Sequence, residues 1–304
     1  MGASRFIARQ HPKAGQSNAM MHSPELRKRA PSRVAVVVPV YQQCLSKTER
    51  YSFDTTVEIL RRHDLFIVGP HALKDKLSAM AFACRPISVY SRTFGDAYFR
   101  SVEGYNELMR SLAFYQAFSK YESVLIVQTD ALVFSDQLDR WCDKGYSYVG
   151  APWFAGLNKP CYPLTLAAAG NGGLSLRRVA DFLEVLSRPR HVPNLILGEH
   201  ANSLPIRLSQ WVKHKLVRAY NFDPLFPDIN EDFFWGLLVP RVCSFFTVPT
   251  PEEACAFAFE REPRFLYELN SRQLPFGCHG WEKYDPEFWR SVLTAGHGGL
   301  KPLP

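Results

Sequence analysis

Residues 123–134, SVLIVQTDALVF, constrain the fold more than any other stretch of the chain. Residues 124–127 form a short continuous apolar run in which three of the four side chains are β-branched. Such a run is typical of a strand buried on both faces of a parallel sheet. Asp130 follows shortly after the run, and open α/β sheets bind ligands at the carboxyl ends of their strands. We therefore expect a central strand with a carboxylate at its functional end; a simple turn aspartate is the alternative.

Apolar runs and helical patterns alternate through the first half of the chain. We predict strands at 33–40, 65–68 and 87–90, and helices at 53–62, 73–83 and 101–120. The order β-α-β-α-β-α-β predicts a parallel sheet with right-handed crossovers. The less regular second half predicts strands at 148–153 and 244–248, helices at 179–186, 233–239, 251–259 and 286–293, and a loop at 273–281. The fold class expected is a single α/β domain with a mostly parallel central sheet, flanking helices and a small antiparallel addition.

Domain organisation follows from the same patterns. We expect a disordered basic tail at 1–32, one domain at 33–292 and a flexible tail at 293–304. The domain divides into a nucleotide-binding half, 33–135, and an acceptor half, 136–292. A basic amphipathic helix near 205–220 reads as an insertion with a solvated basic face, and membrane-surface contact is the alternative.

The positive charge of the chain lies almost entirely in its first residues. Residues 1–33 carry +6 of the formal net charge of +7. The rest is nearly neutral, so we expect no nucleic-acid groove. The sequence has no run of about 18 apolar residues and no secretory leader, and its seven scattered cysteines fit reduced thiols. A cytoplasmic protein is expected, and contact of the basic tail or of the helix near 205–220 with the inner face of a membrane is the alternative.

Four features carry candidate chemistry, and each has a plain alternative. They are Asp130, the glycine turn at 170–173, the pair Glu231-Asp232, and His279 between glycines. The turn is compatible with a hairpin, and the acidic pair with a helix cap. An isolated histidine is usually a surface or core residue.

Taken in order, these features resemble the GT-A glycosyltransferases, which share a D-x-D metal motif, a glycine loop, an x-E-D helix start and a late metal-binding histidine. The segments QTDALVF, GAPW, GNGGLSLR, NEDFFW and LPFGCHGW are similar to a bacterial family of unknown function that is placed beside these enzymes. The resemblance covers residues 33–292. It implies a transferase that moves a sugar from a nucleotide-sugar, expected to be UDP-linked, to a hydroxyl of a cell-surface glycan or its lipid-linked precursor, with inversion.

The resemblance also assigns roles to residues of this sequence. Asp232 is the expected base and Glu231 a hydrogen-bonding partner of a sugar. Trp153 is expected to stack on a sugar, because pyranose C–H faces bury well on aromatic rings. Donor-binding residues are Pro39, Val40, Tyr41, Gln128 and Asp130; sugar- or acceptor-binding residues are Trp153, Asn171, Gly172 and Gly173; the metal ligands are Asp130 and His279.

One departure from the family pattern concerns the metal. The D-x-D motif reads Gln128-Thr129-Asp130, so its first carboxylate is an amide. Mn²⁺ or Mg²⁺ is implied, but one anionic ligand is missing, and Arg92 or Arg177 would then take part of the phosphate charge. The missing carboxylate also keeps open a non-catalytic nucleotide-sugar or glycan-binding module.

Other enzyme classes fit less well. A sugar nucleotidyltransferase normally has a glycine-rich, basic loop after its first strand, and here that segment reads PVYQQC. A serine hydrolase would need a G-x-S-x-G elbow, and a Rossmann dehydrogenase a G-x-G-x-x-G after the first strand. The sequence contains no G-x-S-x-G, and no G-x-G-x-x-G follows the first predicted strand.

Overall fold

The computed structural model describes residues 32–157, 159–188 and 229–294. Residues 1–31 of the basic tail predicted at 1–32 lie outside these residues, as do the basic helix predicted near 205–220 and residues 295–304 of the tail predicted at 293–304. Residues 293 and 294 of that tail belong to a helix. Within the described part, no helix combines the length and the apolar character needed to cross a bilayer.

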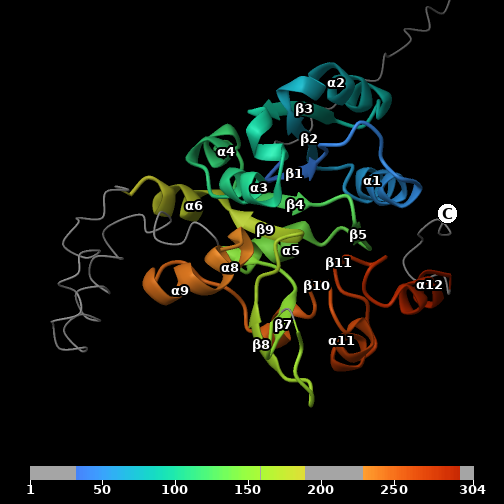
Figure 1. The fold of residues 1–304 in the computed structure, drawn as a ribbon, viewed down its shortest axis with the longest axis vertical. Coiled ribbons are helices and arrows are strands. Elements are labelled where there is room, and N and C mark those ends of the chain that lie inside the picture. Colours follow the sequence, from blue (N-terminus) through green and yellow to red (C-terminus); the bar gives the residue numbers. More distant parts are fainter. Residues whose placement is uncertain (1–31, 158, 189–228, 295–304) are drawn as a thin grey trace, which may run out of the picture. The chain divides into compact units, whose positions relative to one another are not determined.

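A six-stranded sheet forms the centre of the described chain, with the strand order β3-β2-β1-β4-β9-β6 (Figure 1). The four strands β1 (Val34–Pro39), β2 (Asp64–Pro70), β3 (Val89–Phe94) and β4 (Ser123–Val127) are mutually parallel. β9 (Leu174–Arg178) pairs antiparallel with β4, and β6 (Tyr148–Val149) pairs antiparallel with β9. The expected fold class, a mostly parallel sheet with an antiparallel addition, is confirmed.

Helices bury both faces of this sheet. Residues of α1 (Lys47–Ile59), α2 (Lys74–Ala83) and α5 (Leu138–Asp143) join the cluster that holds Val36, Val38 and Leu125. The alternate strand residues Val37 and Ile126 lie in a second cluster with residues of α3 (Val102–Met109), α4 (Leu112–Ala117) and α6 (Val179–Leu186). Because successive strand side chains point to opposite faces, the apolar runs of β1 and β4 supply both cores.

The single helix predicted at 101–120 is wrong. The segment forms two helices, α3 and α4, with Arg110 and Ser111 between them. The hydroxyl of Ser111 accepts a hydrogen bond from the backbone N–H of Phe114, 3.1 Å away, and so caps a new helix start. Serine competes for backbone groups in this way, and an apolar period alone does not reveal the break.

The second half builds two smaller sheets and differs in detail from the prediction. The expected strand at 148–153 is two strands, β6 and β7 (Pro152–Phe154), in different sheets, and β7 pairs with β8 (Leu166–Ala169). The helix expected at 251–259 is only α10 (Pro251–Ala254), and then the short strand β10 (Ala258–Phe259) begins.

Two further segments also differ. Residues 244–248 are not a strand, because the N–H of Phe246 closes a turn onto the carbonyl of Cys243 and, among the described residues, Thr247 makes backbone contacts only with Ser147 and Tyr148. The loop expected at 273–281 contains the strand β11 (Gly277–His279), which lies between β10 and β5 (Ala131–Val133). The remaining elements are η1 (His71–Leu73), η2 (Asp96–Phe99), α8 (Glu231–Phe233), the π segment Phe234–Leu238, α9 (Val239–Val242), α11 (Pro263–Leu269) and α12 (Pro286–Thr294).

The strand order places a switch point between β1 and β4. The chain runs outward from β1 through β2 to β3 and then returns to the other side of β1 to form β4. Connections that leave two neighbouring parallel strands in opposite directions open a crevice at their carboxyl ends. Pro39 ends β1 there, and Gln128 follows β4.

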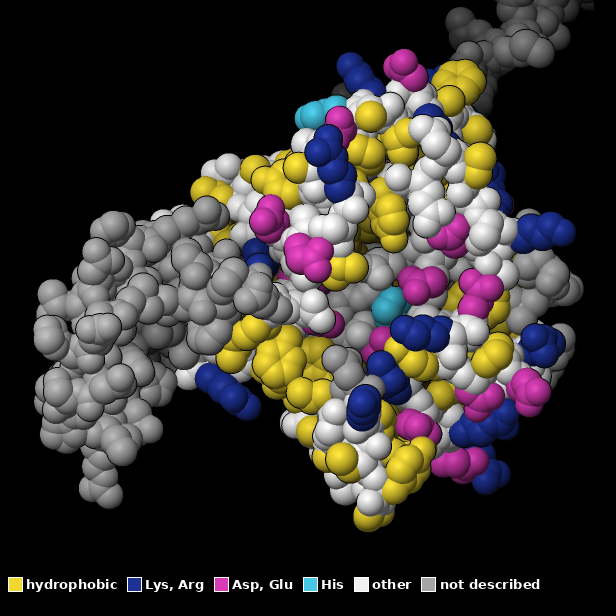
Figure 2. Space-filling view, viewed as in Figure 1, with side chains coloured by type: hydrophobic (Ala, Val, Ile, Leu, Met, Phe, Trp, Pro, Cys, Tyr) yellow, Lys and Arg dark blue, Asp and Glu magenta, His cyan; other side chains and the backbone are white. Residues whose placement is uncertain are grey.

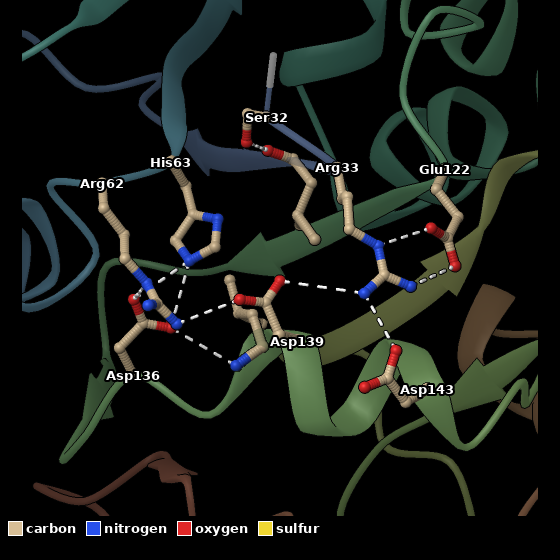
Figure 3. A network of polar contacts seen from close by, with 10 residues as sticks. Ser32, Arg33, Arg62, His63, Glu122, Asp136, Asp139 and Asp143 are labelled. Carbon is tan, nitrogen blue, oxygen red and sulfur yellow. Dashed lines mark hydrogen bonds and ion pairs between the residues drawn. The ribbon is translucent and has the colours of Figure 1, made fainter. Parts of the chain in front are cut away.

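A network of charged side chains fastens the opposite, amino-terminal edge of the sheet (Figure 3). Arg33 precedes β1 and pairs with Glu122, which precedes β4, at 2.8 Å. His63 precedes β2 and lies 3.0 Å from the carboxylate of Asp136. Burial alone would raise the pKa of Asp136, but hydrogen bonds from His63 and Arg62 outweigh it and lower that pKa. This edge is therefore a structural clamp.

Candidate functional site

A pocket of about 520 Å³ lies at the carboxyl ends of β1 and β4. Small-molecule sites have volumes of about 300–1,000 Å³. Of the five residues expected to bind the donor, Pro39, Tyr41, Gln128 and Asp130 line this pocket. Val40 does not line it, because its side chain is 1% exposed and belongs to the core.

The segment between β3 and α3 forms a further wall of the pocket that sequence patterns did not reveal. Phe99 ends η2, Ser101 and Val102 begin α3, and Tyr105 lies one turn further along that helix. Arg100, at the junction, is exposed and is the only cation among the described lining residues. Nothing in the sequence around Arg100 distinguishes it from other exposed arginines.

Glu49 is the other lining residue that sequence reasoning missed. It is the third residue of α1, where one carboxylate oxygen accepts the backbone N–H of Ser46, 2.7 Å away, in a reciprocal capping box. The second oxygen accepts the hydroxyl of Thr129 at 3.0 Å. The S-x-x-E pattern at 46–49 is a known helix-start signal, and here it also ties α1 to the segment after β4.

Pairing of β11 with β5 brings His279 to Asp130. His279 is the register partner of Ala131, and the backbone N–H of Gly280 donates to the carbonyl of Asp130 at 3.1 Å. The imidazole Nε2 lies 3.3 Å from Asp130 Oδ1 and 3.2 Å from Gln128 Oε1. Figure 2 shows a histidine beside acidic side chains in a recess of the viewed face.

Glu260 holds His279 from the other side of the ring. One carboxylate oxygen lies 3.3 Å from His279 Nδ1, and the other accepts the amide N–H of Asn171 at 2.7 Å. Burial by itself would lower the pKa of His279, but hydrogen bonds to Asp130 and Glu260 outweigh it and raise the pKa to about 10. The ring is therefore an imidazolium at neutral pH. No motif pointed to Glu260.

The glycine turn lies between this histidine and the acidic helix start. A Cβ on Gly173 would be 2.1 Å from Nε2 of His279, and one on Gly172 would be 2.4 Å from Oε1 of Glu231. Only hydrogen at these two positions permits such approaches. The turn is not a hairpin, because β8 and β9 belong to different sheets.

Glu231 is buried in a polar network. Its Oε1 accepts a hydrogen bond from Arg177 at 2.8 Å, and its backbone N–H donates to the side chain of Asn106. Its Oε2 is buried and has no hydrogen-bond partner among the residues that the structure describes. Arg177 is fully buried in this pair, and Arg92 donates to the carbonyl of Ala117. Neither arginine lines the pocket, so the pocket gives no support to the expectation that they take part of the phosphate charge.

The carboxyl of Asp232 has a pKa that is raised toward neutral pH. Burial, then the charge of Glu231 and the charge of Glu260, raise its pKa to about 7. Its Cβ would lie 3.1 Å from a Cβ on Gly172. The contacts run from the pocket through Gln128 to His279, then along the glycine turn to Asp232.

Two expectations remain, the stacking of Trp153 on a sugar and the binding of a metal by Asp130 and His279. Trp153 is 7% exposed and packs against Phe233, with ring centroids 6.1 Å apart, so its ring offers no open face to a sugar. Asp130 and His279 are adjacent, but no group of three His, Cys, Asp or Glu side chains in the described ranges is arranged to hold a metal ion.

Comparison with known proteins places the chain in a family. Residues 88–279, more than half of the chain, match the model described as Protein of unknown function (DUF5672). This protein belongs to the DUF5672 family. No curated protein sequence matches this DUF5672 member significantly.

Solved structures with a similar fold include three glycosyltransferases. GlyE of Streptococcus pneumoniae TIGR4 is 12% identical, with a TM-score of 0.45; the match covers 86% of this chain and 60% of GlyE. Mouse xyloside xylosyltransferase 1 is 10% identical, with a TM-score of 0.46 and coverage of 81% and 97%. A glycosyltransferase involved in glycosylation of the major capsid of PBCV-1 is 12% identical, with a TM-score of 0.37 and coverage of 87% and 100%. Likeness at this level carries nothing about the activity of the DUF5672 chain.

Proposed function

We propose that this protein is a glycosyltransferase that moves a sugar from a nucleotide-sugar to an acceptor hydroxyl. One observation carries the proposal. Asp130, His279, the glycine turn and the Glu231-Asp232 pair come from distant parts of the chain and meet beside the pocket at the β1–β4 switch point. The pocket suits the nucleotide, and the carboxylates next to it suit the chemistry of transfer.

In the proposed reaction one bond forms as another breaks. The acceptor oxygen bonds to the anomeric carbon, the bond from that carbon to the phosphate oxygen breaks, and the nucleoside diphosphate leaves with the electron pair. The acceptor loses its proton to Asp232, which is suited to the role because its pKa of about 7 lies close to physiological pH. Attack opposite the leaving group inverts the anomeric centre.

The groups around Asp232 are suited to positioning a sugar. The orphan oxygen Oε2 of Glu231 is a buried acceptor that a sugar hydroxyl would satisfy. Asn171 is fixed by Glu260, and its side-chain carbonyl accepts the N–H of Gly173 at 3.1 Å. Gly172 and Gly173 let the side chains of Glu231 and His279 approach the backbone of the turn closely.

A divalent metal, Mn²⁺ or Mg²⁺, is what the family resemblance implies. Such an ion would neutralise charge on the leaving diphosphate. The residues present do not form a resident site: Gln128 replaces one carboxylate, and both ring nitrogens of His279 face oxygen atoms within 3.3 Å. The proposal therefore routes no step through a metal, and assays with EDTA and with Mn²⁺ test the point.

The finer parts of the proposal concern the substrates. We propose a UDP-linked donor and, as acceptor, a cell-surface glycan or its lipid-linked precursor. A lipid-linked acceptor would bring a cytoplasmic enzyme to the inner face of a membrane. Transfer to extracted lipid-linked glycan but not to free oligosaccharide would favour the precursor.

The test is turnover of a panel of nucleotide-sugars, measured as release of the nucleoside diphosphate with and without acceptor. We expect at least one donor to be turned over, and Asp232→Asn to lower the rate by about 10²–10⁴-fold. Asp75→Asn, on the exposed side of α2, is the matched control and should keep full activity. Turnover of no donor, or full activity of Asp232→Asn, contradicts the proposal. Donor binding without turnover favours a non-catalytic module.

A further inference from the structure

Arg100 is the side chain in the pocket whose role is still open. Its guanidinium is exposed at the junction of η2 and α3 and lines the pocket. It forms no ion pair or side-chain hydrogen bond with any residue that the structure describes. An unpaired arginine at the wall of a concave site is available to a ligand, and its planar fork matches phosphate oxygens.

The anionic side chains of the pocket are already engaged by the protein. Glu49 accepts hydrogen bonds from Ser46 and Thr129, and Asp130 faces His279. The neutral donors on Glu49 leave its charge in place, whereas Arg100 is the one cation among the described lining residues. Its natural complement is an anion that enters with the ligand.

The start of α3 adds to the positive character of this wall. Ser101 caps the helix, its hydroxyl accepts the N–H of Gly104, and both Ser101 and Val102 line the pocket. The first backbone N–H groups and the helix dipole favour a negative group at such an end. One turn along, the Tyr105 hydroxyl is buried beside Gln128 with no hydrogen bond of normal geometry to a described residue. Arginine, helix start and hydroxyl thus come from one short segment, 100–105.

We propose that Arg100, with the amino end of α3 and the Tyr105 hydroxyl, binds the diphosphate of a nucleoside diphosphate in this pocket, and that this binding needs no divalent ion. The inference rests on the proposed function and adds the residues that meet the leaving group. It also accounts for the incomplete metal ligand set, because a fixed guanidinium supplies positive charge where Gln128 has replaced a carboxylate. Arg100 thus takes the role that sequence reasoning gave to Arg92 or Arg177.

Binding by calorimetry tests this without relying on activity. The probes are UDP, UMP, GDP and GMP, each titrated into the full chain in EDTA and again with Mn²⁺. We expect a diphosphate to bind in EDTA more tightly than its monophosphate. Arg100→Gln should weaken binding of the diphosphate about ten- to a hundredfold, which is the usual contribution of a charge-assisted hydrogen bond. It should weaken the monophosphate less, so that the difference in affinity between the two nucleotides becomes smaller.

Arg140→Gln is the matched control, because Arg140 is an exposed arginine on α5 and does not line the pocket. It should bind every probe as the wild type does, which separates a contact from a general loss of positive charge. Unchanged circular dichroism and melting temperature show that each variant is folded.

Each result decides a different point. Equal diphosphate affinity in wild type and Arg100→Gln overturns the role of Arg100 and leaves the proposed function standing. Diphosphate binding only with Mn²⁺ overturns the metal-free part. Binding of none of the four nucleotides in either buffer overturns the inference and removes the support for a nucleotide-sugar donor.

Discussion

Arg177 and Glu231 form an ion pair in the protein interior, with Nη2 and Oε1 2.8 Å apart and both side chains at most 5% exposed. Arg177 also donates to the hydroxyls of Ser175 and Tyr115. The pair connects β9 to the start of α8, the helix that carries Asp232. A buried ion pair therefore fixes the start of the helix that carries the proposed base.

Arg177→Met should destabilise the protein by about 3–5 kcal/mol, because it leaves the Glu231 carboxylate buried without its partner. The measurement is the free energy of unfolding in urea. Arg178→Met is the matched control, since the neighbouring Arg178 is 47% exposed and lies 3.9 Å from Asp181. Exposed pairs contribute about 0–1 kcal/mol. Equal losses in the two variants would show that the buried pair is not what holds this region.

The raised pKa of Asp232 predicts the pH dependence of activity. Only the ionised carboxylate accepts a proton, so kcat/KM should rise about tenfold per pH unit below pH 7 and level off above it. The measurement is a pH–rate profile with saturating acceptor. A profile that is flat between pH 5.5 and 8 would argue against Asp232 as the base.

The same carboxyl should cost stability. Its pKa is raised from 3.8 to about 7, so the folded state binds this proton more tightly than the unfolded state does. The free energy of unfolding then falls as pH rises from about 4 to 7, by up to about 1.4 kcal/mol per pH unit. Asp232→Asn removes the cost and should melt a few degrees above the wild type at pH 8 but not at pH 4. A lower melting temperature at pH 8 would contradict this.

Gly173→Ala adds only one methyl group but should lower both stability and activity. The new Cβ would lie 2.1 Å from Nε2 of His279, so the ring must leave Asp130 and Gln128 or the turn must shift. We expect a loss of about 1–3 kcal/mol in unfolding free energy, together with loss of activity. Gly95→Ala is the control, because its Cβ would meet nothing closer than 3.8 Å. Wild-type stability of Gly173→Ala would mean that the glycine is not required there.

Acid should weaken the clamp at the amino-terminal edge of the sheet. The pKa of Asp136 is lowered in the folded protein, so its contribution is present above the unfolded value of 3.8 and is lost as pH falls through the folded pKa. Asp136→Asn should cost about 1–3 kcal/mol at pH 7 and less at pH 3, measured by urea unfolding at both values. A penalty of the same size at pH 3 would show that the ionised form is not what matters.

Sequence patterns predict an element well where its burial requires a characteristic run or period of apolar residues. The apolar runs of β1 and β4 and the periodicity of α6 predict those elements nearly to the residue. The family motifs name Asp130, Asp232 and His279 as candidates, because carboxylate and imidazole side chains carry chemistry whatever the packing. Glu260 and Arg100 belong to no such motif. Only the tertiary fold brings Glu260 to His279 and Arg100 to the wall of the pocket.

Short strands that depend on distant partners are a second kind of element that sequence patterns do not predict. The strand β11 is three residues long and is stabilised by its partners β10 and β5 rather than by its own propensity. Trp153 shows the same effect for a site residue, because its exposure depends on Phe233, 80 residues further along the chain. No local window contains that information.

The pairing of β11 with β5 has a consequence for a chain still on the ribosome. The parallel strands that shape the crevice are synthesised first, whereas His279 follows Gln128 by 151 residues and reaches it only through this pairing. His279 can therefore take its place beside Asp130 only after the segment that forms β11 has left the ribosome.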